Sequence, residues 1–212
     1  MKRTCFIFTV FALLILLGCR KVEVDCDTFL SVVGSSPEIV TQFDSAGYTA
    51  PIAYGEDCHG ELPVQLSGMV DLSNAGEYNL CYSIVNYDGI TTSRNHTVIV
   101  DGARYLCNKY SIAMYINGTY TATYNDSLVV DPDTHNSFTF SRFANFVNAY
   151  VHGSTYGQTI SIPSQEVYCG NPCTAYIFEA EGHYSDNSNC FIINFTITTD
   201  ITENGYLIFT RN

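Results

Sequence analysis

The segment 76–86 alternates between apolar and polar side chains, and a half-buried β-strand satisfies this pattern directly. Successive side chains of a strand point to opposite faces, so one face of this segment is apolar and the other polar. Asp88-Gly89 follows and favours a tight turn into a second strand over residues 91–100. The pattern therefore predicts a β-hairpin with one face in a hydrophobic core. The inward residues are Tyr78, Leu80, Tyr82 and Ile84, and the outward residues are Glu77, Asn79, Cys81 and Ser83.

Composition extends this prediction to the whole chain. Charged residues make up only 14%, aromatic residues also 14%, and Tyr alone occurs 16 times. Hydroxyl and amide side chains alternate with Val, Ile and Phe, which is typical of half-buried strands. No strong helical period follows the N-terminal region, and segment 142–151 is interpreted as a loop and a strand. We expect an all-β protein with two domains.

Residues 67–82 continue into a pattern of glycines and alternating residues that is specific to one family. Gly68-Met69-Val70-Asp71 leads to the alternating run from Gly76, and Asn86 and Gly89 occupy an N-x-x-G turn. This pattern resembles a bacterial Ig-like domain named after a pesticidal crystal protein. The resemblance implies an Ig-like β-sandwich over residues 35–101 that serves as a spacer or binding module, and it implies no catalytic residues.

A short linker, 101–104, leads to a second unit over residues 105–212. Asn204-Gly205 predicts a turn before the last strand, and Pro163 predicts a strand break because proline has no N–H to donate. The segment 160–165, Ile-Ser-Ile-Pro-Ser-Gln, resembles a motif of lipocalin-like domains in Bacteroidota lipoproteins. We expect an antiparallel meander or barrel, closed or half closed. The expected strands are 110–116, 119–124, 137–141, 146–151, 159–162, 166–168, 175–181, 191–198 and 206–210.

The N-terminus resembles a lipoprotein signal peptide. Lys2 and Arg3 precede an apolar run over residues 5–17, which is shorter than the about 20 residues that a spanning helix needs. Leu-Leu-Gly-Cys ends this run and resembles a lipobox, which implies cleavage after residue 18 and lipid attachment to Cys19. Residues 19–34 then form the lipidated N-terminus and tether. An ordinary signal peptide with an incidental Cys19 is the alternative.

These features predict an exported protein held by lipid at an outer membrane, on the periplasmic face or the cell surface. The acidic residues that soon follow Cys19 resemble surface-export signals of Bacteroidota. The formal net charge is −12, so the chain repels polyanions, and we exclude nucleic acid as a partner.

Seven cysteines remain after the signal peptide and the lipidated position. Their spacing lacks the C-x₂-C pairs of zinc sites, so we predict no metal site and no cofactor, and expect disulfides in this exported chain. Gly170-Asn171-Pro172 forms a tight turn that favours a Cys169–Cys173 disulfide. Cys58 with Cys81 is a second candidate pair. The odd count leaves at least one thiol unpaired within the chain.

Two groups of charged residues suggest sites, each with a simpler alternative. Glu179, Glu181 and His183 alternate along one strand and face one way, which suggests a carboxylate pair or a solvated strand face. Asp131-Pro132-Asp133 begins like a calcium loop but lacks the remaining ligands, so a surface turn is favoured. The motifs of common hydrolases and nucleotide-binding enzymes are missing from the sequence. We therefore expect no enzyme activity.

Tyrosines near predicted turns are candidates for stacking on sugar rings, namely Tyr150, Tyr156, Tyr184 and Tyr206. The alternative is that they are half-buried strand residues with the hydroxyl in water. The sequence thus predicts a lipid-anchored binding protein, with a glycan or a surface protein as partner, that accompanies a nutrient-capture system. A structural spacer or adhesion protein without a small-molecule ligand is the alternative.

Overall fold

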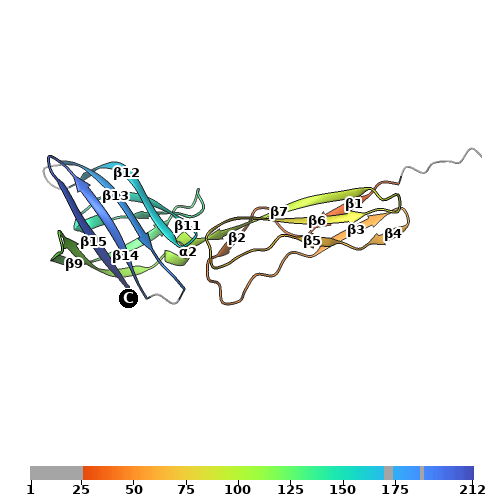
Figure 1. Ribbon diagram of the computed structural model, residues 1–212, viewed down its shortest axis with the longest axis horizontal. Coiled ribbons are helices and arrows are strands. Elements are labelled where there is room, and N and C mark those ends of the chain that lie inside the picture. The colour runs from red at the N-terminus through yellow and green to blue at the C-terminus, as the bar shows by residue number, and fades with distance from the viewer. Residues whose placement is uncertain (1–25, 170–173, 187–188) are drawn as a thin grey trace, which may run out of the picture.

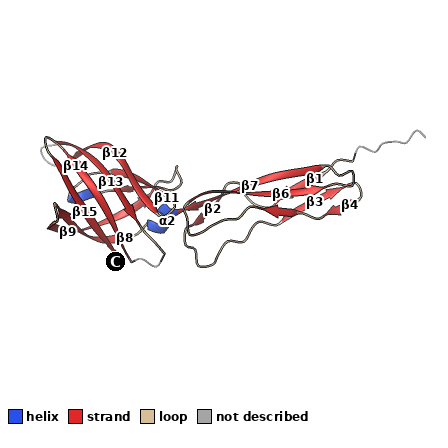
Figure 2. Ribbon diagram, in the orientation of Figure 1, coloured by secondary structure: helices blue, strands red, loops and turns tan. Residues whose placement is uncertain are grey.

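The computed structural model describes residues 26–169, 174–186 and 189–212. Two β domains follow one another along the long axis of the molecule (Figure 1). Strands make up most of both domains, and within these described ranges the short helical turns occur in the C-terminal domain and at the junction (Figure 2). No helix of the described chain has the length and hydropathy required to cross a membrane. The predicted all-β class is confirmed.

The N-terminal domain is an Ig-like sandwich of two sheets. β2(Glu38–Thr41) runs parallel to β7(Thr91–Asp101), and the other strand pairs of the two sheets are antiparallel. The first sheet has the order β1(Phe29–Val32), β3(Ala53–Asp57), β4(Gly60–Leu62). The second has the order β2(Glu38–Thr41), β7(Thr91–Asp101), β6(Gly76–Val85), β5(Gln65–Ser67).

The alternating segment behaves as its pattern predicts. On β6, Leu80, Tyr82 and Ile84 are buried, and Tyr78 packs against the same core. The turn at Asp88-Gly89 joins β6 to β7 as expected, with the Gly89 N–H donating to the Asn86 carbonyl at 3.0 Å. The apolar face of one hairpin therefore supplies much of the sandwich core.

The folded domain begins earlier than the resemblance suggested. β1 lies inside the range assigned to the tether, and it pairs along its whole length with β3. Leu30 of β1 is buried in the sandwich core. The segment 62–66 is divided between β4 and β5, which belong to different sheets, and Pro63 stands between them.

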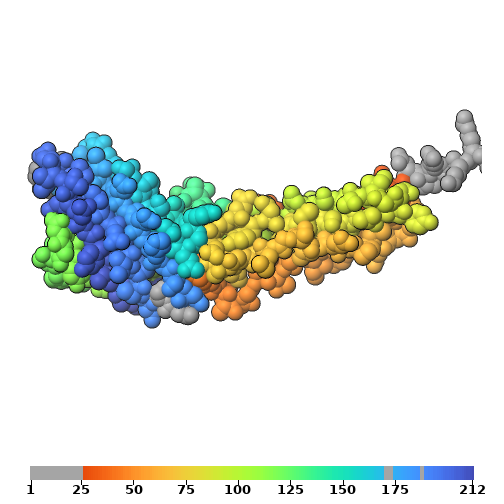
Figure 3. All heavy atoms as spheres, viewed as in Figure 1, coloured from red at the N-terminus to blue at the C-terminus, as the bar shows by residue number. Residues whose placement is uncertain are grey.

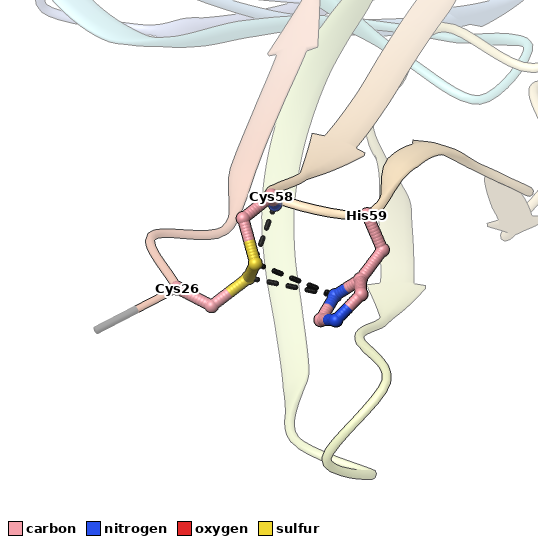
Figure 4. A group of neighbouring side chains, drawn as sticks. All are labelled: Cys26, Cys58 and His59. Atoms are coloured by element: carbon pink, nitrogen blue, oxygen red, sulfur yellow. Dashed lines mark hydrogen bonds between the residues drawn. A yellow bond between two sulfur atoms is a disulfide. The ribbon is translucent and has the colours of Figure 1, made fainter. Parts of the chain in front are cut away.

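The disulfide of this domain joins Cys26 to Cys58, so the proposed Cys58–Cys81 pair is wrong (Figure 4). Cys26 precedes β1 and Cys58 lies in the turn between β3 and β4, and the antiparallel pairing of β1 with β3 brings the two together. Cys81 lies on the outer face of β6 with a free thiol. Sequence reasoning missed this pair because it placed Cys26 in a tether.

The C-terminal domain is a closed antiparallel barrel that begins and ends with neighbouring strands. Its strand order around the barrel is β10-β11-β12-β13-β14-β15-β8-β9. The bounds are β8(Lys109–Ile116), β9(Thr119–Val130), β10(Ser137–Phe140), β11(Val151–Tyr156), β12(Thr159–Cys169), β13(Thr174–His183), β14(Cys190–Thr198) and β15(Thr202–Arg211).

Aromatic side chains fill the barrel interior. The rings of Phe140 and Phe209 lie 5.6 Å apart, and Phe143 packs against Phe140 from the short 3-10 turn η1(Phe143–Asn145). Five phenylalanines are at most 1% exposed: Phe138, Phe140, Phe143, Phe178 and Phe209. Because this core occupies the lumen, the outer wall and the loops are the parts of the barrel that can meet a ligand.

Several strand boundaries in the barrel differ from those expected from the sequence. Pro163 sits where the register between β12 and β13 shifts, so the predicted break is a bulge within one continuous strand. The segment 146–151 is a loop up to Tyr150, and only Val151 belongs to a strand. Asn204-Gly205 does not form a turn but lies within β15. A Cβ on Gly205 would come within 2.4 Å of both the Phe195 ring and the Tyr115 carbonyl, so glycine is needed here for close packing.

The predicted linker is a short helix, α2(Gly102–Leu106), which joins the domains directly (Figure 1). Asp101 ends β7 and caps α2, because its carboxylate accepts the Arg104 N–H at 3.1 Å. The Gly102 N–H donates to Oδ1 of Asn136 in the barrel at 2.7 Å. The chain therefore passes from sandwich to barrel through a buried segment rather than an exposed linker.

Side chains from both domains meet around this helix. Gln42 is 0% exposed, and its amide donates to the carbonyls of Ser73 at 2.8 Å and Gly157 at 2.9 Å. Ala75 and Gly157 exchange two backbone hydrogen bonds, which forms a β-bridge between the domains. The Phe43 ring lies 4.9 Å from that of Tyr105. This junction holds the two domains in one arrangement.

Candidate ligand-binding face

The outer wall of the barrel carries a polar hollow across β12, β13, β14 and β15, the strands that face the viewer in Figure 1. Its volume is about 630 Å³. Short side chains leave the space, because Ser161, Asn194, Thr196 and Asn204 stand where longer residues would fill it. The same face is visible as a continuous surface in Figure 3.

Strand register places a row of outward side chains beside this hollow. Ser161 on β12 is opposite Glu181 on β13, which is opposite Asn194 on β14. Asn194 is opposite Tyr206 on β15, and this pairing continues to Tyr115 on β8 and Tyr120 on β9. We call these six residues the wall row: Ser161, Glu181, Asn194, Tyr206, Tyr115 and Tyr120.

Three tyrosines form the aromatic half of the wall row. The rings of Tyr206 and Tyr115 stack at 4.6 Å with planes 10° apart, and Tyr120 contacts Tyr115 edge-on at 5.7 Å. Because stacked cross-strand rings have their normals along the row, Tyr115 covers one face of the Tyr206 ring and the other face is directed toward Asn194 on the neighbouring strand. The Tyr120 hydroxyl is 3.1 Å from the Thr123 hydroxyl, which helps to fix the outer ring.

The charged and titratable residues that were predicted to lie on one face of a strand do lie on the same face. Glu179, Glu181 and His183 are all exposed on the outer face of β13, and Nδ1 of His183 lies 3.3 Å from the Thr159 hydroxyl. Both glutamates line the hollow. They come from the same strand, whereas a glycosidase uses carboxylates on opposite sides of the bond it cleaves. Ionised carboxylates at these positions can accept hydrogen bonds.

The four candidate stacking tyrosines lie in different places. Tyr206 is half-buried in the wall row. Tyr150 is exposed in the loop before β11, and Tyr156, the last residue of β11, is 82% exposed. Tyr184 is only 4% exposed, so its interpretation as a ligand platform is wrong. Its hydroxyl donates to Oε1 of Gln42 at 2.5 Å, and burial raises its pKa. It belongs to the domain junction.

The Asp131 segment is a surface turn. The Asp131 carboxylate accepts the Asp133 N–H at 2.9 Å, and this hydrogen bond lowers the pKa of Asp131. Such a turn satisfies the carboxylate locally. The predicted preference for a turn over a calcium loop agrees with this geometry.

Cys26, Cys58 and His59 form the cluster of potential metal ligands shown in Figure 4. Nδ1 of His59 is 3.4 Å from the Cys58 sulfur and 3.8 Å from the Cys26 sulfur. The two sulfurs are bonded to each other, so neither is a thiolate that could bind a metal. His59 instead stacks on Tyr87 with ring centres 4.8 Å apart. The cluster is a disulfide with a neighbouring imidazole.

Two of the cysteine predictions, those that involve Cys19 and Cys173, are not tested by the structure. Cys173 and Cys19 lie outside the described residues, so the Cys169–Cys173 disulfide and lipid attachment stay predictions. Cys169 ends β12 and Cys190 begins β14, at opposite ends of the barrel wall. Cys107 and Cys190 carry free thiols.

Sequence reasoning missed Tyr115 and Tyr120 as members of the site. Both lie about 90 residues before Tyr206 in the chain, and only closure of the barrel between β15 and β8 brings them beside it. The run of strand-forming residues over 110–116 was the available signal for Tyr115. It indicated a strand but not its neighbour.

Comparison with known proteins assigns the first domain. Residues 37–100 match the family described as "Bacterial surface protein, Ig-like domain", which confirms the Ig-like resemblance and supports a protein of the bacterial cell surface. No curated protein sequence matches this chain. Among solved structures, the lipoprotein BT2262 from Bacteroides thetaiotaomicron is similar at 15% identity and a TM-score of 0.36. The alignment covers 86% of this chain and 99% of that one.

Proposed function

We propose that this protein is a lipid-anchored, cell-surface glycan-binding protein whose ligand lies on the barrel wall. The observation that carries the proposal is the placement of Tyr206 beside the polar hollow. The ring of Tyr206 lies beside Asn194, and an aromatic ring next to amide and hydroxyl groups suits the mixed surface of a sugar. Aromatic rings contact the apolar side of a sugar, and amides hydrogen-bond to its hydroxyls without requiring charge.

Electrostatics favour a neutral ligand. Glu179 and Glu181 are the charged residues that line the hollow, and the whole chain has a net charge of −12. A sulfated or uronic polysaccharide would be repelled at low salt, and the repulsion would weaken as salt screens the field. We therefore expect neutral, hydroxyl-rich glycans.

The position of the face supports presentation away from a membrane. The described chain starts at Cys26, at the end of the sandwich farthest from the barrel (Figure 1). With lipid on Cys19, the sandwich would project the barrel outward. Labelling cells with a fatty-acid analogue should tag the wild type and not Cys19→Ala, and equal labelling of both would contradict the anchor.

We propose binding without cleavage. The two carboxylates of the hollow stand on the same strand, so neither faces the other across a bound sugar. Product analysis of every glycan that binds tests this directly. Release of shorter sugars by purified protein would show an enzyme.

Calorimetry of the fragment from residue 26 onward against neutral, sulfated and uronic polysaccharides tests the binding site. We expect binding to a neutral polysaccharide that Tyr206→Ala weakens at least about tenfold, which corresponds to about 1.4 kcal/mol. Tyr156→Ala is the matched control, because Tyr156 is 82% exposed and lies outside the wall row. Equal loss in both variants, or binding confined to polyanions, would contradict the proposal.

The domain junction favours a second function, that of a spacer. Gln42, Asp101 and Gly102 are buried between the domains, and Gln42 is hydrogen-bonded both to Ser73 in the sandwich and to Gly157 in the barrel, so the protein has the rigidity that a spacer requires. A spacer needs no ligand on the barrel wall. Failure of all polysaccharides to bind, together with an unchanged surface location, would favour this function.

A further inference from the structure

We infer that the ligand is an internal stretch of a glycan chain several units long, laid across the barrel strands along the wall row. This inference rests on the proposed glycan-binding function and specifies its ligand. It concerns the extent and direction of the site, both of which follow from strand register.

The length of the wall row sets the size of the ligand. Its six side chains come from six consecutive strands, β12, β13, β14, β15, β8 and β9. Neighbouring strands are about 4.8 Å apart, so the row extends roughly 24 Å along the curved wall. A monosaccharide would contact only one or two of these side chains, whereas a chain of several units would contact them all.

The chemistry changes along the row. Tyr120, Tyr115 and Tyr206 provide aromatic rings and hydroxyls at one end, and Asn194, Glu181 and Ser161 provide hydrogen-bonding groups at the other. An extended glycan presents both ring faces and hydroxyls, so consecutive units can use both halves. The contact between Tyr115 and Tyr206 also orders these rings before the ligand arrives, which lowers the entropy cost of binding.

The rows on either side differ and define the path. On one side Ile192 is exposed and Ile208 is half-buried, which forms an apolar border. On the other side Glu179, Thr196 and Asn204 are in register and line the hollow. A chain that follows the wall row thus has an apolar edge along one side and polar partners along the other.

Both ends of the wall row are open. Ser161 at one end and Tyr120 at the other are exposed to solvent. A glycan can therefore continue past each end, and neither its reducing nor its non-reducing terminus needs to be recognised. This geometry is that of a site for polymers.

Calorimetry with malto- and cello-oligosaccharide ladders, from monosaccharide to octasaccharide, tests the inference. In the ladder that binds, we expect affinity to rise at least about tenfold from disaccharide to hexasaccharide and then level off. Capping the reducing end of the hexasaccharide should leave affinity unchanged. Tyr120→Ala should weaken hexasaccharide binding several-fold, while Tyr87→Ala, an exposed tyrosine of the sandwich, should not.

The outcomes separate the inference from the proposed function. Equal affinity for disaccharide and hexasaccharide, loss of binding on capping, or indifference to Tyr120→Ala would overturn the extended site while glycan binding stands. If neither the ladders nor the polysaccharides bind, the proposed function fails and the extended site fails with it. Tyr120 is exposed, so its variant is expected to fold.

Discussion

The Tyr184 hydroxyl donates a hydrogen bond to Oε1 of Gln42, a residue 142 positions earlier in the chain and in the other domain. The same glutamine donates through its amide to Ser73 and Gly157. One buried side chain thus connects a loop of the sandwich to two elements of the barrel. Gly102 is needed beside it, since a Cβ there would lie 2.3 Å from the Tyr184 hydroxyl oxygen and 2.6 Å from Oε1 of Gln42.

Gln42→Ala should loosen the junction. The substitution leaves buried hydrogen-bonding groups without partners, and we expect a loss of about 2–3 kcal/mol in the free energy of unfolding. Urea denaturation measures the loss, and small-angle scattering should show a wider spread of domain orientations. Gln65→Ala, at an exposed position of β5, is the control. Identical denaturation midpoints for the two variants would contradict the role of Gln42.

Gly205→Ala should destabilise the barrel. The new methyl group would meet the Phe195 ring and the Tyr115 carbonyl, and such overpacking costs about 1–3 kcal/mol. A lower melting temperature than that of Thr210→Ala, an exposed site on the same strand, is the expected result. A melting temperature equal to that of the control would show that β15 has room at Gly205.

Breaking the Cys26–Cys58 disulfide should destabilise the sandwich. The bond closes a loop with a sequence separation of 32, and removing it as Cys58→Ser should cost about 3–4 kcal/mol. Chemical denaturation without a reductant measures this loss, and Cys81→Ser should leave the midpoint unchanged. Peptide mapping of the unreduced protein should recover Cys26 linked to Cys58. A link from Cys58 to Cys81 would refute the pairing.

The turn at Asp71 should lose its order at acidic pH. Hydrogen bonds from Ser73 and Asn74 lower the pKa of Asp71 below its usual value of 3.8. The folded state thus favours the carboxylate, so this stabilisation is present above about pH 3.8 and is lost as the pH falls through the lowered pKa. The Ser73 carbonyl accepts hydrogen bonds from Gln42 and Gln158, so the change reaches the junction.

An NMR titration of the Ser73 and Gln158 amides should show this acidic transition in the wild type. Asp71→Asn should lack it, because an amide has no proton to gain in that range. A transition of equal size in both proteins would assign it to another carboxyl group.

Local patterns predicted local structure well. The β6 alternation identified its inward residues, and Asp88-Gly89 identified its turn, because both depend on neighbours in sequence. Asn204-Gly205 looked like a second turn, but there glycine is needed because the ring of Phe195, its cross-strand partner on β14, comes close to the backbone. The dipeptide pattern alone cannot distinguish a glycine required by a turn from a glycine required by close packing between strands.

Relations between distant strands were harder to predict. The partner of Cys58 depended on β1, a strand of only four residues that lies within the segment expected to be the tether. The burial of Tyr184 depended on a glutamine in the other domain. The wall row forms only because β15 pairs with β8 in the closed barrel, and no local sequence pattern specifies that pairing.

The position of the Cys26–Cys58 bond determines how the protein bears a mechanical load. Tension between a lipid on Cys19 and a polymer held on the barrel would enter the described chain at Cys26. Without the bond, this pull would act on β1 and peel it from β3. With it, load passes across the sulfurs to Cys58, and residues 27–57 lie inside a covalently closed loop that cannot be drawn out. Such a protein would resist the drag of a large polymer without lengthening at its membrane end.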